Sequence, residues 1–299
     1  RVHFTVHYAG SLVEGGSMLQ GVSSGIADVG WCPFSYFAGE LPVYNALCVG
    51  GYEWLNSKIG SYVNMDFMKA FPEELPDKLE FMFTHSTIPA ALMTNKPIAT
   101  KEDLKGLQIR CDTVHMDGVA ALGAKPVSMT MPEAYEGLSK NIIDGVLGPT
   151  EVLIGWNLYE TTKYITEAPL LYNAIPVVMF NKKAWNSLPE DIQDIIKKIN
   201  DKHLEDVSTL YDEVHLEALE FGLENGLEVV KVSEEENERW KEALEPCKET
   251  YAENLNNRGL PGNEAMDKIG ELVAKYKEEF AEYDESFRKE IESLIKKHQ

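Results

Sequence analysis

The chain has 299 residues, of which 44% are hydrophobic and 26% are charged, so it can bury a core of ordinary size and is long enough for two domains. Its formal net charge is -21, with 28 Lys and Arg against 49 Asp and Glu. This balance argues against a nucleic-acid partner and against docking on anionic lipid, because both need clustered Lys and Arg. No apolar run approaches the roughly 18 residues that span a bilayer, so no membrane insertion is expected.

The first segment, His3–Tyr8, alternates apolar and polar residues as a strand does. It lacks the charged and apolar regions of a signal peptide. A signal peptide is therefore absent from this sequence, which is typical of a mature or trimmed chain and carries no conclusion about export.

Up to Asn181, short apolar runs alternate with short helical patterns. This alternation predicts an α/β fold with mostly parallel sheets. Besides the first segment, the expected strands are Ala27–Trp31, Leu79–Thr84, Ala91–Asn95, Gln108–Cys111, Lys125–Ser128, Ile143–Leu147 and Ala174–Asn181. The expected helices between them are Gly16–Ser24, Glu53–Phe71, Val114–Leu122 and Glu133–Ser139.

After Pro189 the pattern becomes helical. One run with helical periodicity continues from Glu190 to a good C-terminal cap at Asn225-Gly226. Because it is longer than usual helices, we expect it to cross between two lobes or to brace both. A capping box that starts at Ser233 predicts a second helix to about Leu255, and Glu264–His298 predicts a solvated third.

Patterns of catalytic and metal sites are absent or weak. The sequence lacks G-x-S-x-G, G-x-G-x-x-G, the P-loop and H-E-x-x-H, and its four cysteines form no C-x-x-C pair, although one disulfide is possible. None of the seven histidines is spaced from another ligand as in a metal site. Glu133 and Glu136 form only a weak acid/base pair. We therefore expect no enzymatic activity, no metal and no cofactor.

A single arginine stands out in this acidic chain. The apolar residues Leu107–Ile109 form a short strand that places Arg110 at its end. The planar guanidinium can make two parallel hydrogen bonds to a ligand carboxylate, but an intramolecular salt bridge explains the residue equally well. Cys111 follows directly, and strand alternation directs it to the opposite face, which argues against a thiolate nucleophile activated by Arg110.

Several segments around this arginine have the order and spacing of a known family. They are "MLQGVSSGIADVGWCPFSYFAGELPVYNAL", "DLKGLQIR", "ALGAKPVSMTMPEAYEGLSKNIIDGVLGP", "YETTKYIT" and "IPVVMFNKKAWNSLPEDIQDII". Together they resemble the solute-binding proteins of tripartite ATP-independent periplasmic (TRAP) transporters, the DctP family. The resemblance covers Phe4 to about Gly226.

The resemblance implies a two-lobed α/β fold of the periplasmic-binding-protein (Venus flytrap) type, with crossing strands and long bracing helices. Lobe I is expected to comprise residues 1–90 and about 181–230, and lobe II residues 91–180 and part of 231–299. The C-terminal helices are expected to pack across both lobes. Family members usually carry a strand and a helix before the segment that matches this N-terminus, so lobe I is expected to lack them.

The resemblance also implies a ligand site in a cleft between the lobes. Arg110 occupies the position of the family's arginine that fixes the ligand carboxylate. The other positions that match the family's cleft are Gly15, Trp31, Pro33, Phe34, Tyr36, Met131, Gly148, Tyr172 and Asn173. Phe34 and Met131 are equally compatible with the core.

Two departures from the family pattern restrict which ligands are expected. Gly148 stands where many members have an Asn before the proline, so an amide is absent and space is expected there. Sialic-acid-type members carry a second arginine upstream, where this chain has the region of Ala90. With one cation and aromatic walls, the expected ligand is a bulky or aromatic monocarboxylate, such as an aromatic 2-oxo acid, an arylacetate or a related amino-acid derivative.

The function implied is delivery of this small organic acid to the membrane permease subunits of a TRAP transporter, in the periplasm. An enzyme that acts on a carboxylate substrate on the same two-lobed scaffold is the alternative, because a fold does not determine a function.

Overall fold

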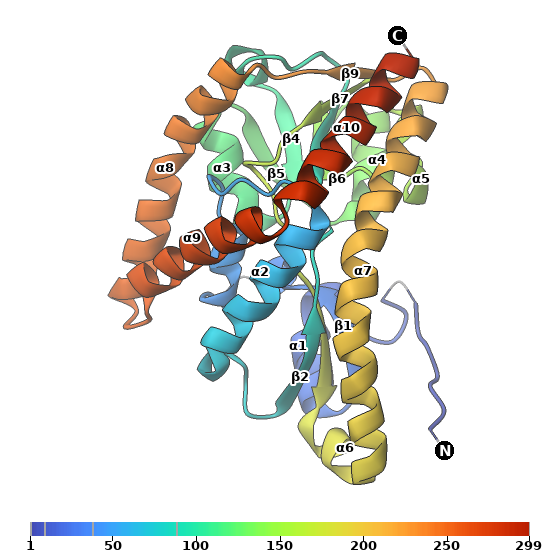
Figure 1. Cartoon of the computed structure of the whole chain (residues 1–299), viewed down its shortest axis with the longest axis vertical. Coiled ribbons are helices and arrows are strands. Elements are labelled where there is room, and N and C mark those ends of the chain that lie inside the picture. Colours follow the sequence, from blue (N-terminus) through green and yellow to red (C-terminus); the bar gives the residue numbers. More distant parts are fainter. Residues whose placement is uncertain (1, 9, 38, 88, 299) are drawn as a thin grey trace.

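The computed structural model describes residues 2–8, 10–37, 39–87 and 89–298. In these ranges the chain forms two β-sheets with helices around them (Figure 1). The smaller sheet has the strand order β1-β8-β2, formed by Val29–Pro33, Pro176–Asn181 and Leu79–Thr84. The larger sheet has the order β5-β4-β6-β3-β7-β9, formed by Lys125–Ser128, Gln108–Cys111, Gly145–Pro149, Ala90–Thr94, Tyr164–Glu167 and Glu228–Val230.

The prediction of mostly parallel sheets was wrong. β8 is antiparallel to both β1 and β2, and β3 is antiparallel to both β6 and β7. Parallel pairing joins β4 to β5, β4 to β6, and β7 to β9. The reason lies in the chain path: after β2 the chain leaves the smaller sheet for β3, and β8 returns after β7, so β8 enters in the opposite direction.

The helices cover the sheets and agree closely with the sequence pattern (Figure 1). Their bounds are α1 Met18–Ser24, α2 Ser57–Ala70, α3 Met116–Ala121, α4 Met131–Ser139, α5 Val152–Gly155, α6 Lys182–Ser187, α7 Glu190–Glu224, α8 Glu234–Asn257, α9 Gly262–Glu279 and α10 Ala281–Lys297. Two differences stand out. The C-terminal tail forms two helices that meet at Phe280, and residues 2–8 form no strand.

α7 is the long helix expected from the sequence, and it contacts elements beside both sheets. Its Asp212 accepts a hydrogen bond from the backbone N–H of Ser57 over 2.6 Å, which caps the first turn of α2. One turn later, His215 Nδ1 lies 2.7 Å from the hydroxyl of Thr150, just after β6. α7 thereby joins a helix that packs against β2 to a loop of the larger sheet.

The division into lobes stays a prediction. The sheets add two facts to it: β8 belongs with β1 and β2, and β9 belongs with the larger sheet. A large apolar cluster includes side chains of both sheets, α2, α8 and α9, and a second joins the larger sheet to α10 through Phe287 and Ile291.

All four cysteines are free, so the possible disulfide is not formed. Cys32, Cys48 and Cys111 are buried, and Cys247 is half-buried. Among the described helices, none combines the length and the apolar character needed to cross a membrane.

Candidate functional site

A cavity of about 1660 Å³ is lined by residues that follow strands of both sheets. Its outer part runs beside the N-terminal segment, β1 and α6. Its inner part is lined by Arg110 of β4, Tyr36, Met131 of α4 and Tyr172.

Arg110 is buried, with 1% of its surface exposed. Its Nε donates to the carbonyl of Met129 over 2.8 Å, and its Nη1 to the carbonyl of Leu147 over 3.4 Å. Its Nη2 donates to Asp112 Oδ1 over 2.6 Å. Because a guanidinium has five N–H groups, one N–H on each terminal nitrogen is left for a ligand. The arginine thus forms the salt bridge and also lines the cavity.

Asp112 is held from a second side. The hydroxyl of Ser35 donates to its Oδ2 over 2.8 Å. Asp112 also lines the cavity, so the positive charge that the cavity offers is already balanced by a buried carboxylate.

Two tyrosines form the inner wall. Burial, with the charge of Asp112 as the next cause, raises the pKa of Tyr172 well above its ordinary value and raises that of Tyr36 as well. Both phenols therefore stay protonated and can donate hydrogen bonds. Tyr172 is fixed by stacking on the buried ring of His115, with the centroids 4.6 Å apart.

Trp31, Pro33 and Gly15 also line the cavity. Trp31 exposes 53% of its surface, which leaves its indole free for contact. A Cβ on Gly15 would lie 2.8 Å from Cδ2 of Tyr36, so only glycine allows the Tyr36 ring to take this position.

Three predicted positions do not line the cavity. Phe34 is a core residue that packs on Phe37 and Tyr44. Asn173 is fully buried, and its amide bonds within the core to groups that include the side chains of Asn64 and Ser86.

Gly148, the third of these positions, lies in β6 beneath Met131. A Cβ there would lie 3.3 Å from Met131 Cε. The space expected beside Gly148 is therefore filled by the methionine side chain, which lines the cavity in its place.

Sequence reasoning missed Asp112, Thr87, Glu151 and Tyr211, all of which line the cavity. The buried hydroxyl of Thr87 has no hydrogen-bond partner among the described residues. Burial raises the pKa of Glu151 to about 8. One signal could have found Glu151: it follows the end of a strand next to β4, and the carboxyl ends of parallel strands are where ligands bind. Tyr211 lies within α7, where no local signal marks it.

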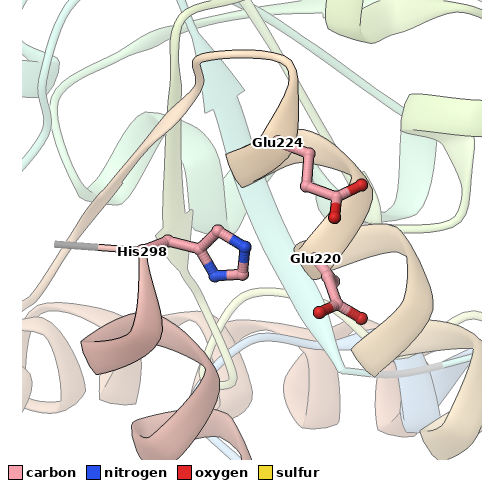
Figure 2. A group of neighbouring side chains, drawn as sticks. All are labelled: Glu220, Glu224 and His298. Carbon is pink, nitrogen blue, oxygen red and sulfur yellow. The ribbon is translucent and has the colours of Figure 1, made fainter.

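A separate group of side chains could in principle hold a metal ion. Glu220 and Glu224 of α7 approach His298, which follows α10, with ligand atoms all within 4.8 Å of one another (Figure 2). Lys297 Nζ already lies 2.6 Å from Glu220 Oε1. Sequence spacing could not reveal this group, because α10 is distant from α7 along the chain. It does not line the cavity.

Residues 1–254 match the family described as bacterial extracellular solute-binding protein, family 7, which is DctP. The chain belongs to this family. A curated relative is the C4-dicarboxylate-binding periplasmic protein DctP of Rhodobacter capsulatus, 26% identical over 167 residues, which are 55% of this chain and 50% of that protein. The chain thus spans about half the length of the curated relatives it matches first.

Solved structures of DctP-type proteins share the fold. A TRAP periplasmic solute-binding protein of Desulfovibrio salexigens has a TM-score of 0.79 at 25% identity, covering 91% of this chain and 85% of that one. A TRAP solute-binding protein of Rhodoferax ferrireducens, in complex with copurified benzoate, has a TM-score of 0.82 at 23% identity, covering 90% and 89%. The predicted family and the two-lobed α/β fold are therefore confirmed.

Proposed function

We propose that this DctP-family protein binds a small organic acid, a bulky or aromatic monocarboxylate, in the described cavity. The observation that carries the proposal is the buried guanidinium of Arg110, which lines the cavity and has one N–H on each terminal nitrogen not used in its three hydrogen bonds. Two parallel N–H groups suit a carboxylate. Tyr36, Tyr172 and Met131 supply flat and apolar surface around it.

Relatives support an aromatic ligand. The R. ferrireducens protein was solved with benzoate, and a marine metagenome protein, described as specific for aromatic acid ligands, with metahydroxyphenylacetate. Arg110 is the only arginine among the described residues that line the cavity, and it is already paired with Asp112, which favours one ligand carboxylate over two.

We also propose that the protein works in the periplasm and delivers its ligand to the permease subunits of a TRAP transporter. The support is family membership and the periplasmic names of its relatives. The proposed lobes, residues 1–90 with about 181–230 and residues 91–180 with part of 231–299, would close over the ligand because the closed state binds it better.

The alternative is an enzyme that acts on a carboxylate. Its nucleophile candidate, Cys111, is unsuited, since burial and the charge of Asp112 raise its thiol pKa to about 12. The test is to incubate the protein with a bound aromatic acid and recover the acid. Unchanged acid supports binding alone, whereas a product would support the enzyme.

The deciding experiment replaces Arg110 with Ala and measures affinity by calorimetry, with 3-hydroxybenzoate, phenylacetate and succinate as probes. Loss of the guanidinium leaves a buried carboxylate unpaired, which costs about 2–5 kcal/mol. We expect the two aromatic acids to bind the wild type and to lose this affinity in the variant. Arg258→Ala, which removes an exposed arginine after α8, is the matched control. Unchanged affinity in Arg110→Ala, or tight binding of succinate alone, would overturn the proposal.

A further inference from the structure

The charges that line the cavity favour a positively charged group on the ligand beside its carboxylate. Arg110 is the only Lys or Arg among the described lining residues, and Asp112 already pairs with it. The carboxyl side chains that line the cavity are Glu14, Asp28, Asp112, Glu133 and Glu151. Carboxyl groups thus outnumber the one described cation, so the lining could pair with a positive group of the ligand as well as with its carboxylate.

Glu151 lies on the same side of the larger sheet's strand ends as Arg110. β4 and β6 are parallel neighbours in which Arg110 is paired with Val146. Glu151 follows the end of β6 at Pro149, so both side chains belong to the carboxyl ends of adjacent parallel strands. Both also line one cavity.

Tyr172 is influenced by the charges of both Arg110 and Glu151. The charges of Arg110, Asp112 and Glu151 all act on its phenol, which places Tyr172 within electrostatic range of both groups. The loop that carries Glu151 is fixed in place, because Thr150 bonds to His215 of α7. Tyr211 of the same helix is also within range of the Glu151 charge.

The carboxyl group of Glu151 has no partner other than its own backbone N–H among the described residues. Burial raises the pKa of this carboxyl, and the hydrogen bond from its own backbone N–H lowers the pKa only in part. Glu133 makes a useful contrast, since its carboxylate accepts hydrogen bonds from the N–H and the hydroxyl of Thr130 over 2.8 and 2.7 Å. Glu151 is half-buried, and a carboxyl withdrawn from water without a partner is costly unless a ligand supplies one.

We propose that Glu151 pairs with a protonated amine of the ligand, while Arg110 holds the ligand's carboxylate. The ligand is then an amino-bearing aromatic or bulky carboxylate, and the charges of ligand and cavity balance at both ends. This inference rests on the proposed function, because it presumes that a carboxylate binds at Arg110.

The test compares acids that differ only in an amine. The probes are phenylalanine against 3-phenylpropanoate, and phenylglycine against phenylacetate, measured by calorimetry near neutral pH. We expect the amino acid of at least one pair to bind about tenfold or more tightly than its deaminated partner, the order expected of a buried ion pair. In Glu151→Gln this preference should disappear, while the deaminated acids keep their affinity.

Proton release provides a second readout. Because the pKa of Glu151 is raised to about 8, its carboxyl is mostly protonated near neutral pH in the empty cavity. Pairing with an ammonium lowers this pKa, so binding should release up to about one proton. Calorimetry in buffers of different ionisation enthalpy measures this release, which should vanish in Glu151→Gln.

The matched control is Glu136→Gln, which changes an exposed glutamate of α4 that bonds to Lys140 and does not line the cavity. It should behave as the wild type. Equal or tighter binding of the deaminated acids by the wild type would overturn the inference and leave the proposed function intact. An amine preference that persists in Glu151→Gln would overturn the role of Glu151. If neither member of any pair bound, the proposed function itself would fail.

Discussion

Arg110 and Asp112 form a buried ion pair in the wall of the cavity, with Nη2 2.6 Å from Oδ1 and only 1% and 7% of the two side chains exposed. The two residues are two positions apart at the end of β4, so both side chains lie on one face of the strand. The carboxylate compensates the arginine's charge, and it would compete for the guanidinium with the proposed ligand carboxylate.

Replacing Asp112 with Asn separates these two effects. The empty protein should lose about 2 kcal/mol of unfolding free energy, because a buried cation loses its charged partner but keeps a hydrogen-bond acceptor. Affinity for a monocarboxylate that binds the wild type should rise, because the competing charge is gone. Denaturant unfolding and calorimetry measure the two quantities. Ser35→Ala, which removes one hydrogen bond to Asp112 but no charge, is the control. Weaker binding in Asp112→Asn would mean that the carboxylate mainly orients Arg110.

A methyl group on Gly15 should disturb the cavity through Tyr36. The added Cβ would lie 2.8 Å from the ring, so the ring must move. We expect affinity for the ligand to fall about tenfold, or about 1.4 kcal/mol, with a smaller change in unfolding free energy. The neighbouring Gly16→Ala is a close control, because nothing lies within 4 Å of its added Cβ. Equal affinities for the two variants would show that Tyr36 does not contact the ligand.

The stability of the protein should depend on pH through Glu151. Its folded pKa of about 8 lies above that of an unfolded glutamate, so between these values the folded state holds a proton that the unfolded state has lost. The unfolding free energy should therefore fall as pH rises from about 5 to about 9. In Glu151→Gln this fall should be smaller by at least about 1 kcal/mol. Urea unfolding at several pH values measures it, and identical slopes would contradict the raised pKa.

The cysteines should differ in reactivity toward a thiol reagent. Cys247 is half-buried, whereas burial of Cys32 and Cys111 raises both pKa values to about 12. In the folded protein we expect one thiol to react quickly and the others only as the protein unfolds. Four thiols should react in denaturant, in agreement with four free cysteines. Fewer than four would indicate a disulfide.

Much of the fold could be predicted because its signals are local. The apolar runs at Leu79–Thr84, Gln108–Cys111 and Lys125–Ser128 became strands with the same bounds. The long run after Pro189 became one helix, because its apolar spacing continues without a break. Strand direction could not be predicted, since it depends on how the chain passes between the sheets.

The site could be predicted only in part, because tertiary packing brings some of its residues together. Arg110 was found because strand and family pattern both mark its position. The sequence left open whether it pairs internally or with a ligand; in the structure it pairs with Asp112 and also lines the cavity. Glu151 and Tyr211 come from a loop and a helix that only tertiary packing brings to the cavity. Phe34 and Asn173 follow the family pattern but serve the core.

The continuity of α7 has a mechanical consequence. Its 35 residues form a rod of about 52 Å, and from Glu190 to Phe221 the helix contains no Pro or Gly at which it could kink sharply. Asp212 and His215 attach it, within one turn, to α2 and to the loop after β6. Because both attachments lie in one turn, a rotation of one sheet against the other would bend or twist this turn of α7 and store elastic strain in it. Tyr211 belongs to the same turn and lines the cavity, so a ligand that contacts Tyr211 would act directly on this turn.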